Sequence, residues 1–255
     1  MVLAADIGNS TIALGCFEGS EIRFVERIAT NRHSSALEYA MLIKTVLELN
    51  GLSGCTFEGS IISSVVPSIT NMLSAAMERL TGKKPLIVGP GLKTGLEIRT
   101  ENPAQLGSDR VTDAVAAIHH YPCPLILIDM GTATTISVVD EKKQFLGGMI
   151  MPGLRISMEA LAAKTSQLPQ ISLDPPKQAI GRNTVDCMKS GVIFGCAATI
   201  DGAIDRIEAE LGQPCTEVST GGHAGIVIPY CKHRIVLDDQ LLLKGLMILY
   251  RKNQG

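Results

Sequence analysis

The sequence predicts an α/β protein of two duplicated domains, and three observations lead to this fold class. The hexapeptide DIGNST at Asp6–Thr11 recurs as DMGTAT at Asp129–Thr134. Each copy follows a short apolar stretch and precedes segments with the alternation typical of strands. Helical periodicity follows the strands. We therefore expect two βββαβα domains, over residues 1–120 and 121–255, on either side of a ligand cleft.

The first half of the sequence predicts secondary-structure elements in the order βββαβαβ. Its opening strands are expected at Val2–Ala5, Thr11–Phe17 and Ile22–Ile28. A helix follows, because Ser35 and Glu38 fit a capping box and Gly51 stands just past the last helical repeat. The remaining elements are a strand, a helix and a strand: Ser60–Val66, Ser68–Leu80 and Pro85–Gly89.

A loop and a helix precede the second half of the sequence. Residues 85–107 contain Gly89-Pro90-Gly91 and Asn102-Pro103, which favours a functional loop over a core element. A helix that contains Val111 and Ile118 leaves this loop. The expected later elements are three strands, then mostly helices with one strand among them, and a packed C-terminal helix: Leu125–Ile128, Thr135–Val139, Gln144–Ile150, Thr216–Ser219 and residues 240–252.

The composition favours a cytoplasmic protein that binds small molecules. The 255 residues are 45% hydrophobic, enough for a substantial core, and no apolar run approaches the roughly 20 residues that span a bilayer. An acid and a glycine turn interrupt the N-terminus where a signal peptide would be apolar. Seven scattered cysteines without a Cys-x-x-Cys pair indicate reduced thiols. A net charge of −2 and no Lys/Arg run argue against nucleic-acid or membrane partners.

The repeated turn has the chemistry of a phosphate site. An aspartate at a strand end, then a glycine and hydroxyl side chains, offers backbone N–H groups, hydroxyl donors and a carboxylate. A carboxylate beside phosphates is repulsive unless a cation lies between them, so the turn predicts metal-assisted nucleotide binding. A single copy would more simply be a hairpin turn, but two copies in matching contexts favour the phosphate site. The sequence has no P-loop motif and no dinucleotide-binding fingerprint.

The duplicated turn resembles those of the acetate and sugar kinases, heat-shock ATPases and actin, which share ribonuclease-H-like (actin-like ATPase) domains around a nucleotide cleft. Longer segments resemble type III pantothenate kinases over nearly the whole chain. They are DIGNSTIALGCFEG at the start, GPGLKTGLEIRTENPAQLGSDRVTDAVAA (Gly89–Ala117), LIDMGTATTISVVDEKKQFLGGMIMPGL (Leu127–Leu154), NTVDCMKSGVIFGCAATIDG (Asn183–Gly202) and STGGHAG (Ser219–Gly225).

This resemblance implies ATP-dependent phosphorylation of pantothenate, the first step of coenzyme A biosynthesis, with Mg2+ and a monovalent cation such as K+ or NH4+. It implies that Asp109 is the general base, that Asp129 binds the monovalent cation and that Thr132 contacts ATP. The implied pantothenate contacts are Gly107, Ser108, Asp109, Arg110 and Thr184. The implied first ATP phosphate turn is Asp6, Ile7, Gly8, Asn9, Ser10, Thr11, Ile12 and Ala13. The resemblance also implies a homodimer.

Each assignment has a structural alternative. Asp109 and Arg110 could be a helix-terminal acid and a surface ion pair, Asp129 could satisfy its own turn, and Thr184 could be a helix N-cap. Thr100 stands where the resembled family commonly has a tyrosine that lines the pantothenate pocket. At the level of function, the alternatives are a catalytically inactive nucleotide-binding regulator of the same fold, or another kinase or phosphatase of the superfamily.

Overall fold

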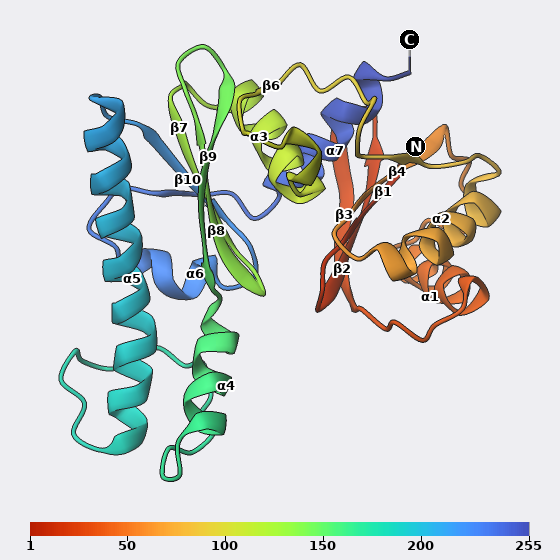
Figure 1. The fold of residues 1–255 in the computed structure, drawn as a ribbon. Coiled ribbons are helices and arrows are strands. Elements are labelled where there is room, and N and C mark those ends of the chain that lie inside the picture. The colour runs from red at the N-terminus through yellow and green to blue at the C-terminus, as the bar shows by residue number, and fades with distance from the viewer. Residues whose placement is uncertain (255) are drawn as a thin grey trace. The chain divides into compact units, whose positions relative to one another are not determined.

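The computed structural model describes residues 1–254, which form two compact units (Figure 1). Unit 1 contains Met1–Leu96, Glu101–Ala116 and the segment from Leu241. Unit 2 contains Glu97–Thr100 and Ala117–Gln240. The two units each have their own sheet and are described separately below.

Unit 1 is a five-stranded sheet with the order β3-β2-β1-β4-β5. Its strands are β1 (Val2–Ile7), β2 (Thr11–Glu18), β3 (Glu21–Ala29), β4 (Gly59–Ser64) and β5 (Leu86–Ile87). The first three form an antiparallel meander, and β4 and β5 continue the sheet in parallel with β1. Helices α1 (Ala36–Leu49) and α2 (Pro67–Thr81) pack on it around one apolar core. This is the predicted βββαβαβ order.

Short-range interactions explain where the helices of unit 1 begin and end. The predicted capping box of α1 is confirmed, because Ser35 Oγ accepts the Glu38 N–H at 3.3 Å and Glu38 Oε2 accepts the Ser35 N–H at 2.6 Å. Pro67 lies in the first turn of α2, and Gly82 ends that helix with a φ of 70° in the left-handed region. Both helix ends therefore follow from local sequence.

The C-terminal helix α7 (Leu241–Lys252) belongs to unit 1, whereas the predicted boundary placed it in the second domain. Gly245 makes the close packing possible, since a Cβ there would collide with the backbone carbonyl of Thr112 on α3 (Ser108–His120). On the sheet side, a Cβ at Gly15 would lie 3.1 Å from Leu243. The helix is buried along one face, as its apolar sequence indicates.

Unit 2 is a six-stranded sheet with the order β11-β10-β7-β8-β9-β6. Its strands are β6 (Glu97–Ile98), β7 (Leu125–Met130), β8 (Ala133–Val139), β9 (Gln144–Pro152), β10 (Thr216–Thr220) and β11 (Val236–Leu237). Strands β7, β8 and β9 repeat the antiparallel meander of unit 1, and β10 pairs in parallel with β7. Two helices, α4 (Leu154–Lys164) and α5 (Thr184–Leu211), separate β9 from β10. Short helices at Pro103–Gln105, Ala224–Val227 (α6) and Ile228–Tyr230 complete the described elements.

Helix α5 is long and apolar enough to cross a membrane by length and composition, whereas no apolar segment of that length was expected from the sequence. Its buried residues, among them Ile193, Ile200 and Ile204, lie in the core of unit 2 together with Ile126 and Ile128 of β7. This burial is the behaviour of a core helix in a soluble protein. All seven cysteines are free thiols, as predicted.

Candidate active site

The predicted phosphate turn at residues 6–13 closes the β1–β2 hairpin of unit 1. Asp6 pairs with Ala13 and Ile7 with Ile12, and the Gly8 N–H donates to the Thr11 carbonyl at 3.0 Å. The side chains of Ile7, Ile12 and Ala13 are buried, so they offer a ligand at most their backbone groups. The exposed residues of the turn are Asn9, Ser10 and Thr11. These three supply the polar surface that a phosphate needs.

Arg32 is a cation at this turn that sequence reasoning missed. Its Nη2 donates to Asn9 Oδ1 at 3.0 Å, and the nearby Thr30 Oγ1 donates to the Gly8 carbonyl at 2.7 Å. Both residues follow β3, which pairs with β2 so that Thr11 lies opposite Ala29. The strand register, taken from the predicted meander, was the signal that could have placed them beside the turn.

The second turn closes the β7–β8 hairpin of unit 2 and is one residue shorter between its paired strands. The paired residues Asp129 and Thr135 enclose five residues, whereas the paired residues Asp6 and Ala13 enclose six. The Gly131 N–H donates to the Ala133 carbonyl at 3.0 Å. Thr132 is exposed and the Asp129 side chain is half-buried. Both copies close a β-hairpin after an aspartate, but they differ in the number of residues that the hairpin encloses.

Glycines from other segments of unit 2 enclose this second turn. Gly221 has a φ of 95°, and a Cβ there would collide with the Asp129 carboxylate and lie 2.6 Å from the Met130 nitrogen. A Cβ at Gly153 would likewise lie 2.6 Å from the Gly131 carbonyl oxygen. At both positions the chain packs directly against the turn, which only a residue without a side chain allows. With its carboxylate and the Thr132 hydroxyl, the turn offers the oxygen ligands that K+ or Mg2+ prefers, so its residues fit a cation.

The predicted substrate segment begins helix α3 at the same sheet edge as the first turn. Ser64, at the end of β4, pairs with Ile7, and its N–H donates to Ser108 Oγ at 3.0 Å. Ser108 Oγ also donates to the Ser64 carbonyl at 2.9 Å and lies 3.1 Å from Ser63 Oγ. The Ser108 hydroxyl is thus engaged within unit 1, and it brings the start of α3 next to the Asp6 turn.

Asp109 is held by its neighbours in a half-buried position. Its Oδ1 accepts the Arg110 N–H at 2.8 Å, and a Cβ at Gly107 would collide with the same carboxylate. Burial raises the pKa of Asp109 above its ordinary value, while the N–H and the charge of Arg110 partly oppose the rise. A carboxylate with a raised pKa is a better proton acceptor at neutral pH. The absence of a side chain at Gly107 leaves space for the Asp109 carboxylate in this position.

Thr184 is the first residue of α5 rather than its cap. The cap is Asn183, whose side chain accepts the Asp186 N–H at 2.9 Å, so capping does not account for Thr184. Thr184 lines a mostly apolar cavity of about 750 Å³ within unit 2. Thr134 of the second turn lines the same cavity, and its buried Oγ1 has no hydrogen-bond partner among residues 1–254. The cavity therefore connects the second turn with the start of α5.

The structure thus brings the predicted residues together in two groups. In unit 1, the Asp6 turn and Gly107–Arg110 share one sheet edge. In unit 2, Asp129 and Thr132 lie on the second turn, and Thr184 shares a cavity with Thr134 of that turn. His119 and His120 end α3 with their rings 5.0 Å apart and belong to neither group.

Comparisons with known proteins identify the family. The family model described as type III pantothenate kinase matches residues 2–206. A Brevibacillus brevis protein named type III pantothenate kinase is 45% identical over 259 residues, covering 100% of both chains.

Two solved structures share the fold at low identity. A Sinorhizobium meliloti protein described as a candidate 2-dehydro-3-deoxygalactonokinase has a TM-score of 0.63 at 13% identity, with 100% of this chain and 97% of that chain covered. A Campylobacter jejuni protein described as a candidate Baf family transcriptional activator has a TM-score of 0.62 at 18% identity, with 98% of both chains covered. The fold is therefore the two-domain fold of these proteins, and the sequence matches decide the family. The chain belongs to the type III pantothenate kinase family.

Proposed function

We propose that this protein transfers the γ-phosphoryl group of ATP to the primary hydroxyl of pantothenate and so forms 4′-phosphopantothenate, the first step toward coenzyme A. Family membership and 45% identity to a named relative over the full length support this reaction. The structural observation that supports it best is the position of Asp109, a carboxylate with a raised pKa at the sheet edge that carries the Asp6 turn.

The chemistry assigned to Asp109 is proton acceptance. The pantothenate hydroxyl oxygen forms the new bond to the γ-phosphorus while the bond from this phosphorus to the β,γ-bridging oxygen breaks, and ADP leaves with that electron pair. The Asp109 carboxylate takes the hydroxyl proton. Because this proton leaves late in a loose transition state, a modestly raised pKa suffices.

The two turns are assigned to ATP and its cations. Backbone N–H groups and hydroxyls of residues 6–13 bind phosphate oxygens, and Arg32 adds a positive charge that its bond to Asn9 orients. Thr132 contacts ATP, and Asp129 binds a monovalent cation, K+ or NH4+. Bound cations, including the Mg2+ that accompanies ATP, neutralise phosphate charge that would otherwise repel these carboxylates.

Pantothenate is assigned to the residues around the base. The guanidinium of Arg110 pairs with the pantothenate carboxylate through its forked donors. Gly107 and Ser108 contribute backbone contacts, since the Ser108 hydroxyl is already hydrogen-bonded within unit 1. Thr184 contacts the substrate from the start of α5. Thr100 carries a buried Oγ1 that has no hydrogen-bond partner in residues 1–254, which fits a hydroxyl kept for a ligand.

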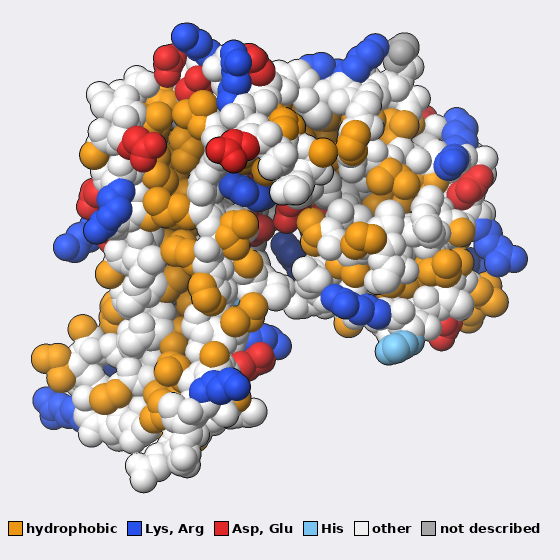
Figure 2. All heavy atoms as spheres, viewed as in Figure 1, with side chains coloured by type: hydrophobic (Ala, Val, Ile, Leu, Met, Phe, Trp, Pro, Cys, Tyr) orange, Lys and Arg blue, Asp and Glu red, His pale blue; other side chains and the backbone are white. Residues whose placement is uncertain are grey.

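A homodimer in the cytoplasm completes the proposal. Unit 2 exposes large apolar side chains on β9 and α4 and near the start of α5: Ile150, Ile156, Leu161, Ile180 and Val185. Figure 2 shows hydrophobic side chains gathered over α4 and α5 on the face in view. An exposed apolar surface of this kind is typical of a subunit interface.

The experiment that tests the function is a coupled ADP-release assay with Mg-ATP and pantothenate, in K+ and in Na+ buffer. We expect turnover that needs pantothenate and is faster in K+. An inactive regulator, the main alternative, would bind nucleotide without turnover in either buffer. A kinase for another substrate would be protected against thermal unfolding by a sugar rather than by pantothenate.

A further inference from the structure

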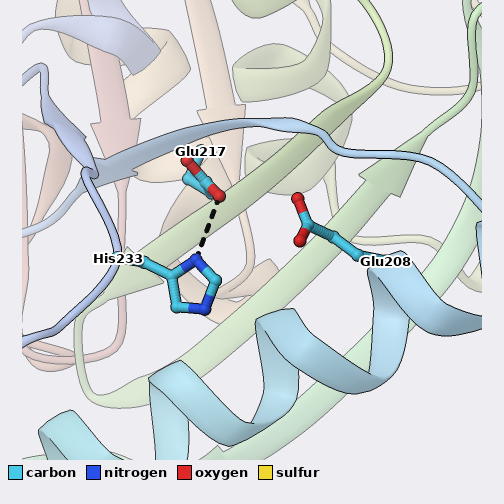
Figure 3. Close-up of side chains that lie close together, drawn as sticks. All are labelled: Glu208, Glu217 and His233. Carbon is cyan, nitrogen blue, oxygen red and sulfur yellow. Dashed lines mark ion pairs between the residues drawn. The ribbon is translucent and has the colours of Figure 1, made fainter.

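A second cluster of ionisable side chains lies in unit 2, at the end of α5 away from Thr184. Glu208 comes from the last turns of α5, Glu217 from β10, and His233 from the segment that follows the short helix at Ile228–Tyr230. One ligand atom from each of the three lies within 4.8 Å of the other two. Figure 3 shows the three side chains converging from these elements.

The distances within the cluster are those of metal ligands. His233 Nδ1 lies 3.3 Å from Glu217 Oε1. Two ligands of a tetrahedral zinc ion, at bond lengths of about 2.0 to 2.2 Å, lie roughly 3.3 to 3.5 Å from each other. The ligand atom of Glu208 lies within 4.8 Å of both, so the three side chains can converge on one ion.

Supporting contacts orient two of the three side chains. His233 Nε2 lies 2.9 Å from Asp205 Oδ1, within hydrogen-bond distance, so the ring directs Nδ1 toward the two glutamates. A carboxylate on the far nitrogen of a histidine is the usual partner of a metal-binding imidazole. The Cys215 N–H donates to Glu208 Oε1 at 2.7 Å and fixes that carboxylate from the other side.

The charges around the cluster favour a cation. Asp205, Glu208 and Glu217 lie around one imidazole, and the side chain of Glu217 is only 12% exposed. Asp201 adds a buried carboxylate that accepts the backbone N–H groups of Lys232 and His233. The group therefore carries an excess of negative charge that a divalent ion would offset.

We propose that Glu208, Glu217 and His233 form a binding site for a divalent transition-metal ion, with zinc the favoured ion and Asp205 the residue that orients His233. Imidazole nitrogen and carboxylate oxygen atoms are both zinc ligands in proteins. The site is distinct from the second turn, because Glu217 pairs with Ile126 whereas Thr220 pairs with Asp129, about 10 Å further along the strands. The ion ties α5, β10 and the His233 segment together.

The test uses the untagged full-length protein after dialysis against EDTA, without nucleotide or Mg2+. Zinc binding is measured by calorimetry, and cobalt is added in a parallel titration to record its visible absorption. We expect one zinc per chain, a rise in Tm, and a cobalt spectrum without a thiolate charge-transfer band. His233→Asn and Glu217→Gln should abolish binding, and Asp205→Asn should weaken it about 10- to 100-fold.

Matched controls are His33→Asn and Glu210→Gln, which replace exposed residues of the same types. They should bind zinc as the unaltered protein does, and circular dichroism should show that every variant is folded. The proposal is overturned by zinc binding that survives His233→Asn and Glu217→Gln, by cobalt bound through thiolates, or by the absence of binding. Asp205→Asn retains all three ligands, so the weakening of zinc binding in this variant tests the proposal even if another variant fails to fold.

Discussion

At the scale of single residues, each position of the segment Gly107–Arg110 has a different physical role. Gly107 leaves space for the Asp109 carboxylate, and Ser108 attaches α3 to the end of β4. Asp109 is the proposed base, and its pKa is raised by burial. The sequence motif identified this segment, but it could not show that the serine hydroxyl is engaged inside unit 1, because its partners Ser63 and Ser64 lie some 45 positions away.

The pH dependence of activity should report the raised pKa of Asp109. The ionised carboxylate is the proton acceptor, so kcat/KM is high above this pKa and falls as the pH drops through it. Because burial raises the pKa, the acid limb should lie above the ordinary aspartate value of 3.8. A pH profile of kcat/KM measures it. An acid limb at or below the ordinary value would contradict the description of this site.

Ser108→Ala should reduce stability more than activity. The substitution removes the acceptor of the Ser64 N–H, and a buried donor left without a partner costs about 1 to 3 kcal/mol. Urea unfolding measures the loss of free energy, with Ser53→Ala, at an exposed position, as the control. A large fall in kcat at unchanged stability would instead mean that the hydroxyl contacts the substrate.

Arg32→Ala tests the cation that the structure adds to the first turn. The side chain is exposed, so its contribution to ATP binding should be modest, about a 2- to 5-fold rise in KM for ATP. The KM for pantothenate should not change. The exposed Arg79 on α2 supplies the control variant Arg79→Ala. An equal effect of both substitutions would show that only general charge matters.

At the scale of elements, local signals predicted the helix ends and the strands of both meanders. The capping box at Ser35 and the alternation of the strands are short-range signals, and each is confirmed. The strand expected at Pro85–Gly89 is present as the shorter β5, but the two-residue strands β6 and β11 were beyond such signals, because pairing with a neighbouring strand defines them. For the same reason, sequence reasoning missed Arg32 and the Glu208, Glu217 and His233 cluster, whose members are far apart in the chain.

Gly221→Ala should disrupt the second turn. Alanine is strained at a φ of 95°, and its Cβ would collide with the Asp129 carboxylate. We expect a loss of at least about 1 to 3 kcal/mol in stability and a weaker response of activity to K+. Gly222→Ala is the matched control, because a Cβ there has open space. Equal activation by K+ in the two variants would show that Gly221 has no role in cation binding.

At the scale of the whole molecule, duplication provides one polar turn for each unit, and the copies have diverged. The first turn encloses one more residue than the second and has Arg32 beside it, while the second is enclosed by Gly153 and Gly221. This divergence matches their different proposed tasks, with phosphate binding at the first turn and a cation at the second. Sequence comparison alone shows only that the turns are alike.

The most direct test of the account is detection of the product by 31P NMR after incubation of the protein with Mg-ATP, pantothenate and K+. We predict a 4′-phosphopantothenate signal that grows with time, and a rate about 100- to 10,000-fold lower for Asp109→Asn, the range that a general base contributes. Glu101→Gln, an exposed acid in the same loop, should keep the normal rate. Normal product formation by Asp109→Asn would contradict the assigned base, and no product under any condition would contradict the proposed function.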